Sequence, residues 1–392
     1  MSPAIAQDGL PAENVSFIRH IAPLLDSRCG RCHVQARRGG VDLGSHAAIF
    51  RGTEEGGPIV VPGDANSSRI VEVLSSGEMP RGGPRFSEME LAAVQGWVRE
   101  GAKFDGRNAN DSLAALAAQL LGSLSAEELS AMRRETMQAN WSKTMPGTMP
   151  VIVESLNFLV VSNLPREQIV EGSELAEQQL RDIARWSGIP NNNNRNLLKG
   201  RVTIYLFAQR YDYSEFGQMV ETRDLPRNQR RHQRYSVKDA YGAAILEDGW
   251  NDDATFGLTQ MIATLWMSSQ GAFPNWFCEG CGAVAATTLH RKSTQGTAWD
   301  DALAGVAQRM EKVEQLTDSA NESDDALIAR YGFVSVLTTN RTRFQSLIKQ
   351  VAGGAEFEPT FTAIYRASPS DAIVAWRNRA ATSPTPRRRN RR

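Results

Sequence analysis

Two thiols and an imidazole lie within one short stretch of the chain, Cys29-Gly30-Arg31-Cys32-His33. Two cysteines at this spacing can form thioether bonds to the two vinyl groups along one edge of a haem. The imidazole after the second cysteine is then delivered to the iron as the proximal ligand. A zinc half-site, or a disulfide beside a chance histidine, is the alternative, but no second Cys/His pair follows at zinc-finger spacing. The motif therefore predicts one covalent haem c held by Cys29, Cys32 and His33.

A six-coordinate electron carrier needs a second axial ligand, and Met79, within a Gly-Glu-Met-Pro sequence, is the candidate. A thioether ligand favours reduced iron and raises the potential relative to two imidazoles. Methionine more often fills a core, but the Gly- and Pro-rich sequence around Met79 indicates an exposed loop. His20 and His46 are the rival ligands. We expect His46 to be a surface residue and His20 to lie on the polar side of a helix.

Two amphipathic helices are predicted to frame this motif. Apolar residues at helical spacing form the first helix. A capping box at Ser87 and Glu90 opens the second helix, and Gly101 ends it. The apolar positions are Phe17, Ile18, Ile21, Leu24 and Leu25, then Leu91, Val94, Trp97 and Val98. The segment between the helices is rich in glycine pairs and is predicted as loop, so a haem would have to fill the core.

About a quarter of the chain resembles the planctomycete-type cytochrome c domain, a class I-like haem module. Besides C-G-R-C-H, the matching segments are 21–25 (IAPLL), 39–43 (GGVDL), 56–64 (GGPIVVPGD), 78–80 (EMP) and 97–102 (WVREGA). The resemblance implies a small helical haem fold with His33 and Met79 as the axial ligands of the iron. Members of this family are generally assigned electron transfer, and their redox partner proteins are unknown.

A second cysteine pair, Cys278 and Cys281, flanks Glu279 in a C-E-G-C sequence. Gly282 stands where a haem motif needs histidine, so this is not a second haem site. In an oxidising compartment a local disulfide is the most ordinary interpretation. The alternatives are a redox-active pair, a metal site that adds Glu279 but lacks an evident fourth ligand, and reduced core residues on one helix.

From residue 151 onward the pattern changes to mixed α and β. Strands are predicted at 158–161, 202–206 and 241–246, and the second alternates as a half-buried strand should. A helix with apolar residues at Ala176, Leu180 and Ile183 follows the first strand. A buried helix is expected around residues 255–268, and amphipathic helices continue to about residue 379.

The region from about 145 to 380 resembles the peptidase-MA-like, gluzincin-type domains. The matching segments are 157–161 (NFLVV), 202–207 (VTIYLF), 274–280 (PNWFCEG) and 331–333 (YGF). In such enzymes a buried helix carries H-E-x-x-H and a later glutamate completes the zinc site. Here Thr259 and Ala263 occupy the two histidine positions, Gln260 replaces the base, and only Glu279 remains. One carboxylate cannot hold zinc and a glutamine cannot accept a proton, so we expect no zinc and no proteolysis.

Composition and charge argue against two broad classes of protein. The 392 residues include 44 Lys plus Arg and 44 Asp plus Glu, which gives no electrostatic reason to expect nucleic-acid binding. No apolar run approaches the length of a membrane span. The arginines of residues 387–392 are expected to form a solvated tail. Binding of that tail to an anionic surface or an acidic partner is the alternative.

The predicted fold class is α+β, and five segments are expected. They are a tail at 1–13, an all-helical cytochrome c domain at 14–106, a linker with one helix (123–137) at 107–150, a degenerate zincin-like domain with mixed α and β at 151–380, and a basic disordered tail at 381–392. In the first tail, Ala4-Ile5-Ala6 before Gln7 resembles the end of a removed export signal.

The expected function is single-electron transfer through one haem, in the periplasm or cell envelope of a bacterium. The second domain would supply docking or architecture. One alternative is a thiol-disulfide module in which Cys278 and Cys281 receive electrons from the haem. The other is an assembly subunit whose haem mainly stabilises the fold.

Overall fold

The computed structural model describes residues 10–34, 37–51, 58–81, 85–189 and 197–382, which form parts of two compact units, Met1–Leu124 and Ser125–Arg392. Each unit is described by itself. Several sequence features lie outside the described residues: the signal-like segment 4–7, the glycine pair at 56–57 and the arginine tail at 387–392. The segment expected as a linker contributes one helix to each unit.

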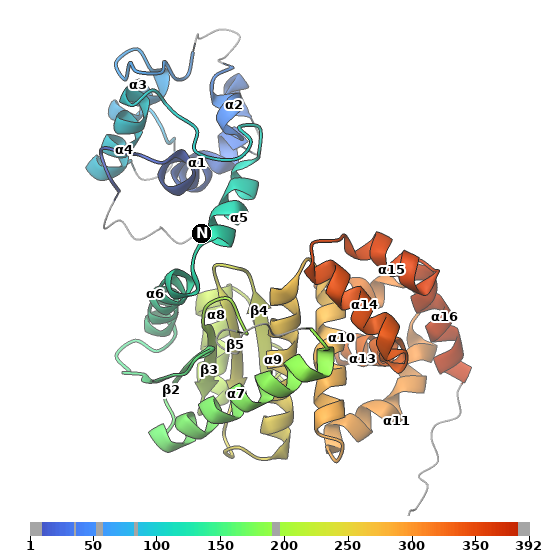
Figure 1. The fold of residues 1–392 in the computed structure, drawn as a ribbon. Coiled ribbons are helices and arrows are strands. Elements are labelled where there is room, and N and C mark those ends of the chain that lie inside the picture. Colours follow the sequence, from blue (N-terminus) through green and yellow to red (C-terminus); the bar gives the residue numbers. More distant parts are fainter. Residues whose placement is uncertain (1–9, 35–36, 52–57, 82–84, 190–196, 383–392) are drawn as a thin grey trace, which may run out of the picture. The chain divides into compact units, whose positions relative to one another are not determined.

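Short helices build the first unit (Figure 1). They are the π-helical segments η1 (Phe17–Ile21) and η2 (Gly30–Val34), the 3-10 turn η3 (Arg38–Gly40), and the α-helices α1 (Ala22–Cys29), α2 (His46–Ile49), α3 (Arg69–Ser75), α4 (Glu88–Arg99) and α5 (Leu113–Ser123). The two framing helices predicted from the sequence are present as η1 with α1 and as α4. The segment between them was predicted as loop, but it also contains α2 and α3.

Helix α4 begins with the predicted capping box. The Ser87 hydroxyl accepts from the Glu90 amide at 3.2 Å, and the Glu90 carboxylate accepts from the Ser87 amide at 2.7 Å. The buried face of α4 packs into one apolar cluster with η1 and α1, which we call the first core. Its most buried members are Phe17, Ile21, Leu25, Ile49, Val94, Trp97, Val98 and Leu116. Apolar burial in this core holds the two framing helices together.

A five-stranded mixed sheet forms the centre of the second unit, with strand order β1-β2-β3-β5-β4. The strands are β1 (Val151–Glu154), β2 (Phe158–Ser162), β3 (Val202–Phe207), β4 (Arg231–Tyr235) and β5 (Ala240–Ile245). The three central strands are parallel, and both edge strands pair antiparallel to their neighbours. All six residues of β3 are buried. The prediction of a half-buried strand at 202–206 was therefore wrong, because helices cover both faces of the sheet.

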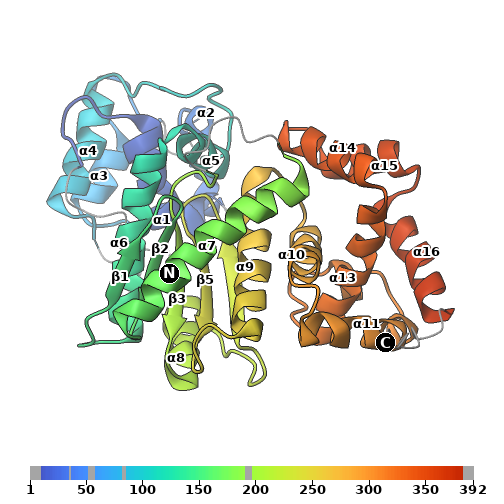
Figure 2. The same ribbon diagram turned by 60° about the horizontal axis from the view of Figure 1, so that its bottom comes forward.

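The helices of the second unit are α6 (Ala126–Thr144), α7 (Arg166–Ser187), α8 (Arg210–Glu221), α9 (Asp252–Gln270), α10 (Asn275–Leu289), α11 (Thr294–Arg309), α12 (Glu314–Thr317), α13 (Asp324–Thr339), α14 (Arg341–Ala352), α15 (Phe357–Tyr365) and α16 (Pro369–Thr382). Helices α6 and α8 pack on one face of the sheet, and α7 and α9 pack on the other (Figure 2). The remaining helices continue from α10 beyond α9.

Successive side chains along each strand point to opposite faces of the sheet, and each face contributes to a different apolar cluster. Val160 and Ile204 point into the larger cluster under α7 and α9, while Val161 and Tyr205 point into a smaller, aromatic cluster under α6 and α8. The helical first unit and the mixed sheet of the second unit together confirm the predicted α+β class. Among the described residues, no helix is both long and apolar enough to span a membrane.

Candidate haem site and the second unit

The attachment segment follows helix α1 without a break. Cys29 is the last residue of α1, and Gly30 opens the π-helical turn η2 that carries Cys32 and His33. The Gly30 amide donates to the Asp26 carbonyl, so the helical hydrogen-bond ladder runs into the motif. Both thiols and the imidazole are therefore presented from one rigid stretch of backbone.

The His33 side chain has a buried nitrogen that needs a partner. Its Nδ1 atom is buried and has no hydrogen-bond partner in the described structure. Its backbone carbonyl accepts from the Leu43 amide at 2.9 Å, which fixes the position of the residue. A half-buried imidazole without a protein partner suits a residue that is to bind iron.

Burial raises the pKa of the Cys29 thiol to about 11, against the opposite effect of the neighbouring Arg28 guanidinium. Cys29 and Val34 pack against the first core, so the environment is apolar. This environment suits a thioether bond to an apolar ring edge better than the zinc half-site that the sequence left open.

Met79 also packs against the first core. Its side chain is half-buried and packs against the apolar cluster that Cys29 and Val34 also contact. Its amide donates to the Val73 carbonyl at 3.0 Å, which ties the 77–80 segment to helix α3. Cys29 and Met79, two members of the predicted donor set, therefore border the same apolar cluster, which fits a haem. The ligand role of Met79 itself stays a prediction.

The two rival histidines are engaged elsewhere. His46 was predicted at the surface, but it is 9% exposed, and its Nε2 atom hydrogen-bonds the Ala102 carbonyl at 2.9 Å. The expectation was wrong because α2 turns this ring into an aromatic cluster with Phe17, Phe50, Trp97 and Phe104. His20 is half-buried, and its Nδ1 atom accepts from the Ser16 amide at 3.0 Å.

An ion pair that the sequence did not reveal holds the attachment helix. The Arg28 guanidinium donates from Nη2 to both carboxylate oxygens of Glu90 at 2.8 Å, and from Nε to Oε1 at 3.1 Å. The Glu90 side chain is 5% exposed, and the guanidinium lies 5.6 Å from the centre of the Phe86 ring. The residue before the first haem cysteine is thus fastened to α4 by a charge-assisted fork.

Comparison with known families decides what this site is. Residues 29–82 match the model of the family described as Planctomycete cytochrome C. The chain contains a planctomycete cytochrome c domain. The match begins at the first cysteine of the haem motif and ends just after Met79, so it spans Cys29, Cys32, His33 and Met79. A domain of this family implies haem-based electron transfer. No curated protein matches the chain.

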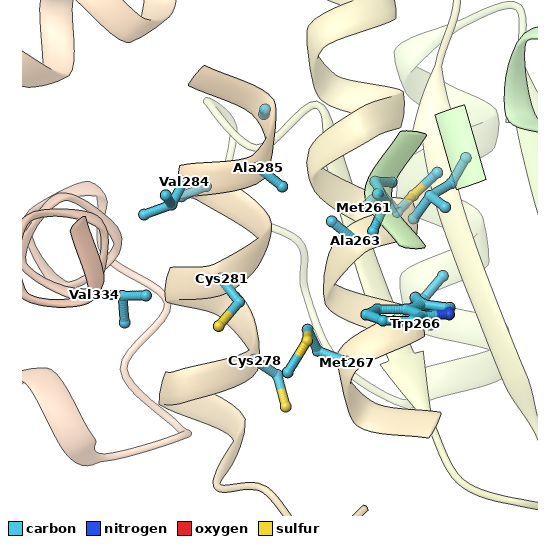
Figure 3. Packing of buried hydrophobic residues seen from close by; sticks show 14 of the residues in the cluster. Met261, Ala263, Trp266, Met267, Cys278, Cys281, Val284, Ala285 and Val334 are labelled. Atoms are coloured by element: carbon cyan, nitrogen blue, oxygen red, sulfur yellow. The ribbon is translucent and has the colours of Figure 1, made fainter. Parts of the chain in front are cut away.

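The second cysteine pair lies in the second unit, inside the larger apolar cluster. Cys278 and Cys281 are one turn apart on α10 and are 1% and 0% exposed (Figure 3). Both are free thiols, so the structure does not contain the disulfide that the sequence suggested. Burial raises the pKa of Cys278 to about 12 and that of Cys281 well above its usual range. Of the interpretations that the sequence left open, the structure therefore agrees with reduced core residues on one helix.

Glycines explain why this helix carries small residues. A Cβ added to Gly280 would lie 2.8 Å from the Arg330 carbonyl of α13, and one added to Gly282 would lie 2.7 Å from the Gln260 carbonyl of α9. Helix α10 is therefore packed backbone to backbone against two neighbours. The glycines of the C-E-G-C-G sequence allow this close approach, and the cysteines are small enough to fit the same packing.

The positions that correspond to a zinc site hold no set of ligands. The Thr259 hydroxyl contacts His290 Nε2 at 2.7 Å and donates to the Thr255 carbonyl at 3.0 Å. Ala263 is buried, and the Gln260 Oε1 atom is buried without a partner. Glu279 forms an ion pair with the buried Arg330. Burial raises the pKa of the Glu279 carboxyl, although the positive charge of Arg330 acts in the opposite direction. The Thr259 hydroxyl on α9 is therefore engaged by structural partners, and the Gln260 amide oxygen has none among the described residues.

Proposed function

We propose that this protein transfers single electrons through one haem c, with Cys29 and Cys32 as its thioether anchors. His33 and Met79 would be the two axial ligands of the iron. The observation that carries the proposal is the C-x-x-C-H turn at the rim of an apolar core that Met79 also borders, within the segment that matches the cytochrome family. When bound, a haem supplies an iron atom that changes its charge by one electron without breaking bonds.

The chain's own residues would set how easily that charge changes. Met79 supplies a thioether, which stabilises reduced iron relative to a second imidazole. The Arg28 charge next to Cys29 is neutralised by Glu90, so the pair adds rigidity without a strong local field. The apolar contacts of Cys29 and Val34 exclude water from one side of the site, which also favours the less charged, reduced state.

For the second unit we propose a docking or architectural role on a peptidase-like, gluzincin-type fold. Two features support the resemblance: a mixed sheet with antiparallel edge strand β4, and the side-by-side packing of α9 with α10. The residues at the ligand and base positions, Thr259, Gln260 and Ala263, cannot bind zinc or take a proton from water. Metal analysis of the purified protein that returned one stoichiometric zinc would contradict this assignment.

We further propose that the protein is exported to the periplasm or cell envelope, since c-type haem is attached outside the cytoplasm. Its partner would be another redox protein, with no role in nucleic-acid binding. The thiol-disulfide alternative finds no support in Cys278 and Cys281, whose sulfur atoms are buried and whose thiolates are strongly disfavoured.

The experiment is a rapid-mixing reduction of the matured full-length protein by a small-molecule electron donor, followed by the haem spectrum. We expect full one-electron reduction, with reoxidation by a high-potential acceptor returning the starting spectrum. A haem that resists reduction by every mediator would favour the assembly-subunit alternative. The same titration in a Met79→Ala variant reports the second ligand.

A further inference from the structure

A chain of hydrogen bonds links five side chains at the aromatic cluster of the second unit. Tyr213 Oη lies 2.7 Å from His232 Nδ1, and His232 Nε2 lies 2.9 Å from Glu221 Oε1. Tyr241 Oη donates to the same carboxylate oxygen. Arg223 Nε donates to the other carboxylate oxygen at 2.5 Å. The chain therefore runs from a phenol through an imidazole to a carboxylate, with residues from α8, β4 and β5.

The positions of the protons follow from the charge of Glu221. Burial alone would raise the pKa of this carboxyl, but hydrogen bonds from His232, Tyr241 and Arg223 lower it to about 2, so it is ionised at neutral pH. An ionised carboxylate can only accept, so His232 must donate from Nε2. A neutral ring that donates from Nε2 has its lone pair at Nδ1, and in this tautomer Tyr213 donates its phenolic proton to that nitrogen.

Burial excludes the hydrolytic chemistry that such a triad performs elsewhere. The Tyr213 and Glu221 side chains are fully buried and His232 is 6% exposed, so no substrate can reach the hydroxyl. Burial also raises the pKa of Tyr213, and the phenol therefore does not ionise by losing its proton to water. Electron transfer does not need contact with solvent. An oxidised phenol is a strong acid, and a hydrogen-bonded base is what stabilises its neutral radical.

We propose that Tyr213 is a site of reversible one-electron oxidation in which the phenolic proton moves to His232. The electron leaves to a strong one-electron oxidant of the radical or high-valent metal class. The Tyr213 O–H bond breaks and an N–H bond forms at His232 Nδ1, which gives a neutral phenoxyl radical and an imidazolium. Glu221 stabilises the imidazolium through Nε2–H, as a carboxylate does in a catalytic triad. Reduction returns the electron and the proton along the same path.

Neighbouring aromatic rings provide a route for the electron, and two other buried tyrosines serve as internal controls. The Tyr213 ring lies 6.2 Å from Phe207, which stacks on Trp141 at 6.0 Å and 2°. Tyr205 accepts a hydrogen bond from Asn140 at 3.3 Å, an amide that cannot take a proton. Tyr241 donates to the Glu221 carboxylate and not to an imidazole. Of these three buried tyrosines, only Tyr213 donates to an imidazole.

Flash photolysis of the full-length protein with a ruthenium polypyridyl photo-oxidant and an electron scavenger tests the site. We expect the optical and electron paramagnetic resonance signals of a neutral tyrosyl radical. Tyr213→Phe should remove most of this signal, whereas Tyr205→Phe and Tyr241→Phe should retain it. His232→Gln should lower the radical yield at least several-fold. Circular dichroism of each variant confirms that the fold is retained.

High-field resonance spectra of the wild-type radical provide a test that needs no variant. A radical at Tyr213 should show the g-shift and the exchangeable proton coupling of a hydrogen bond from an imidazolium. An unchanged radical yield in Tyr213→Phe would overturn the assignment. So would a wild-type radical without that hydrogen-bond signature, or the absence of a tyrosyl radical in the wild-type protein. The site lies in the second unit, and these signals do not depend on the haem assignment.

Discussion

Arg28 and Glu90 form a two-point ion pair, and through it the residue before the first haem cysteine is bound to helix α4 of the same unit. Glu90 also completes the capping box of α4, so one carboxylate accepts hydrogen bonds from Arg28 and from the Ser87 amide. The start of α4 and the end of α1 are fixed by the same side chain. Changes at Glu90 should therefore affect the haem environment as well as stability.

We expect Glu90→Gln to destabilise the first unit by about 3 kcal/mol, because it leaves the Arg28 guanidinium without its charge partner. Urea unfolding followed by the haem absorbance reports this unit alone. Glu88→Gln, an exposed neighbour on the same helix, is the matched control and should change stability by less than about 0.5 kcal/mol. Equal effects of the two variants would contradict a structural role for the pair.

The pH dependence of the second unit should follow Glu221. Its pKa lies near 2 in the folded protein and at about 4.3 in an unfolded chain. The stabilisation, about 3 kcal/mol, is therefore complete above pH 4.5 and is lost as the pH falls towards 2. Urea unfolding followed by tryptophan fluorescence between pH 7 and pH 2.5 measures it. Glu221→Gln should flatten this dependence, and the exposed control Glu174→Gln should leave it unchanged.

Met79→Ala should remove the spectral signature of a sulfur-ligated ferric haem and lower the midpoint potential, because the thioether that favours reduced iron is lost. Met89→Ala is the matched control, since Met89 is 44% exposed on α4. Spectroelectrochemistry of the two variants and the wild type gives both readouts. An unchanged spectrum and potential in Met79→Ala would show that another residue is the second ligand.

Thiol counting should distinguish buried from reactive cysteines. In the folded, matured protein we expect no reaction with a water-soluble disulfide reagent, because Cys278 and Cys281 are buried with raised pKa values. In denaturant, two thiols per chain should react, since Cys29 and Cys32 would be thioethers. Rapid reaction of two thiols in the native state would support the thiol-disulfide alternative.

The sequence predicted the parts of the first unit that depend on local rules. The capping box at Ser87 and the apolar stripes of both framing helices follow from residues close together in the chain. The burial of His46 did not follow, because it depends on contacts with Phe17, Trp97 and Phe104, which are distant in sequence. The Arg28–Glu90 pair spans 62 residues and had no local signal.

The second unit shows the same division. Its three central strands were located by their apolar residues, but the edge strands β1 and β4 were not predicted. Alternation at 202–206 also gave the wrong burial, because Thr203 and Tyr205 of β3 are buried as well. The polar chain Tyr213, His232 and Glu221 could not be predicted, since α8 and β4 bring together residues with no motif spacing. A histidine within a strand next to several arginines was the one available signal.

The central claim is that Cys29 and Cys32 carry a covalently attached haem with His33 on its iron. Acid-acetone extraction of protein expressed with haem-maturation machinery, followed by intact mass measurement, tests it most directly. We predict that the colour stays with the protein and that the mass rises by one haem, and that a Cys29→Ala/Cys32→Ala double variant loses both. A wild-type protein whose pigment passes into the acetone phase, or whose mass shows no haem, would contradict the account.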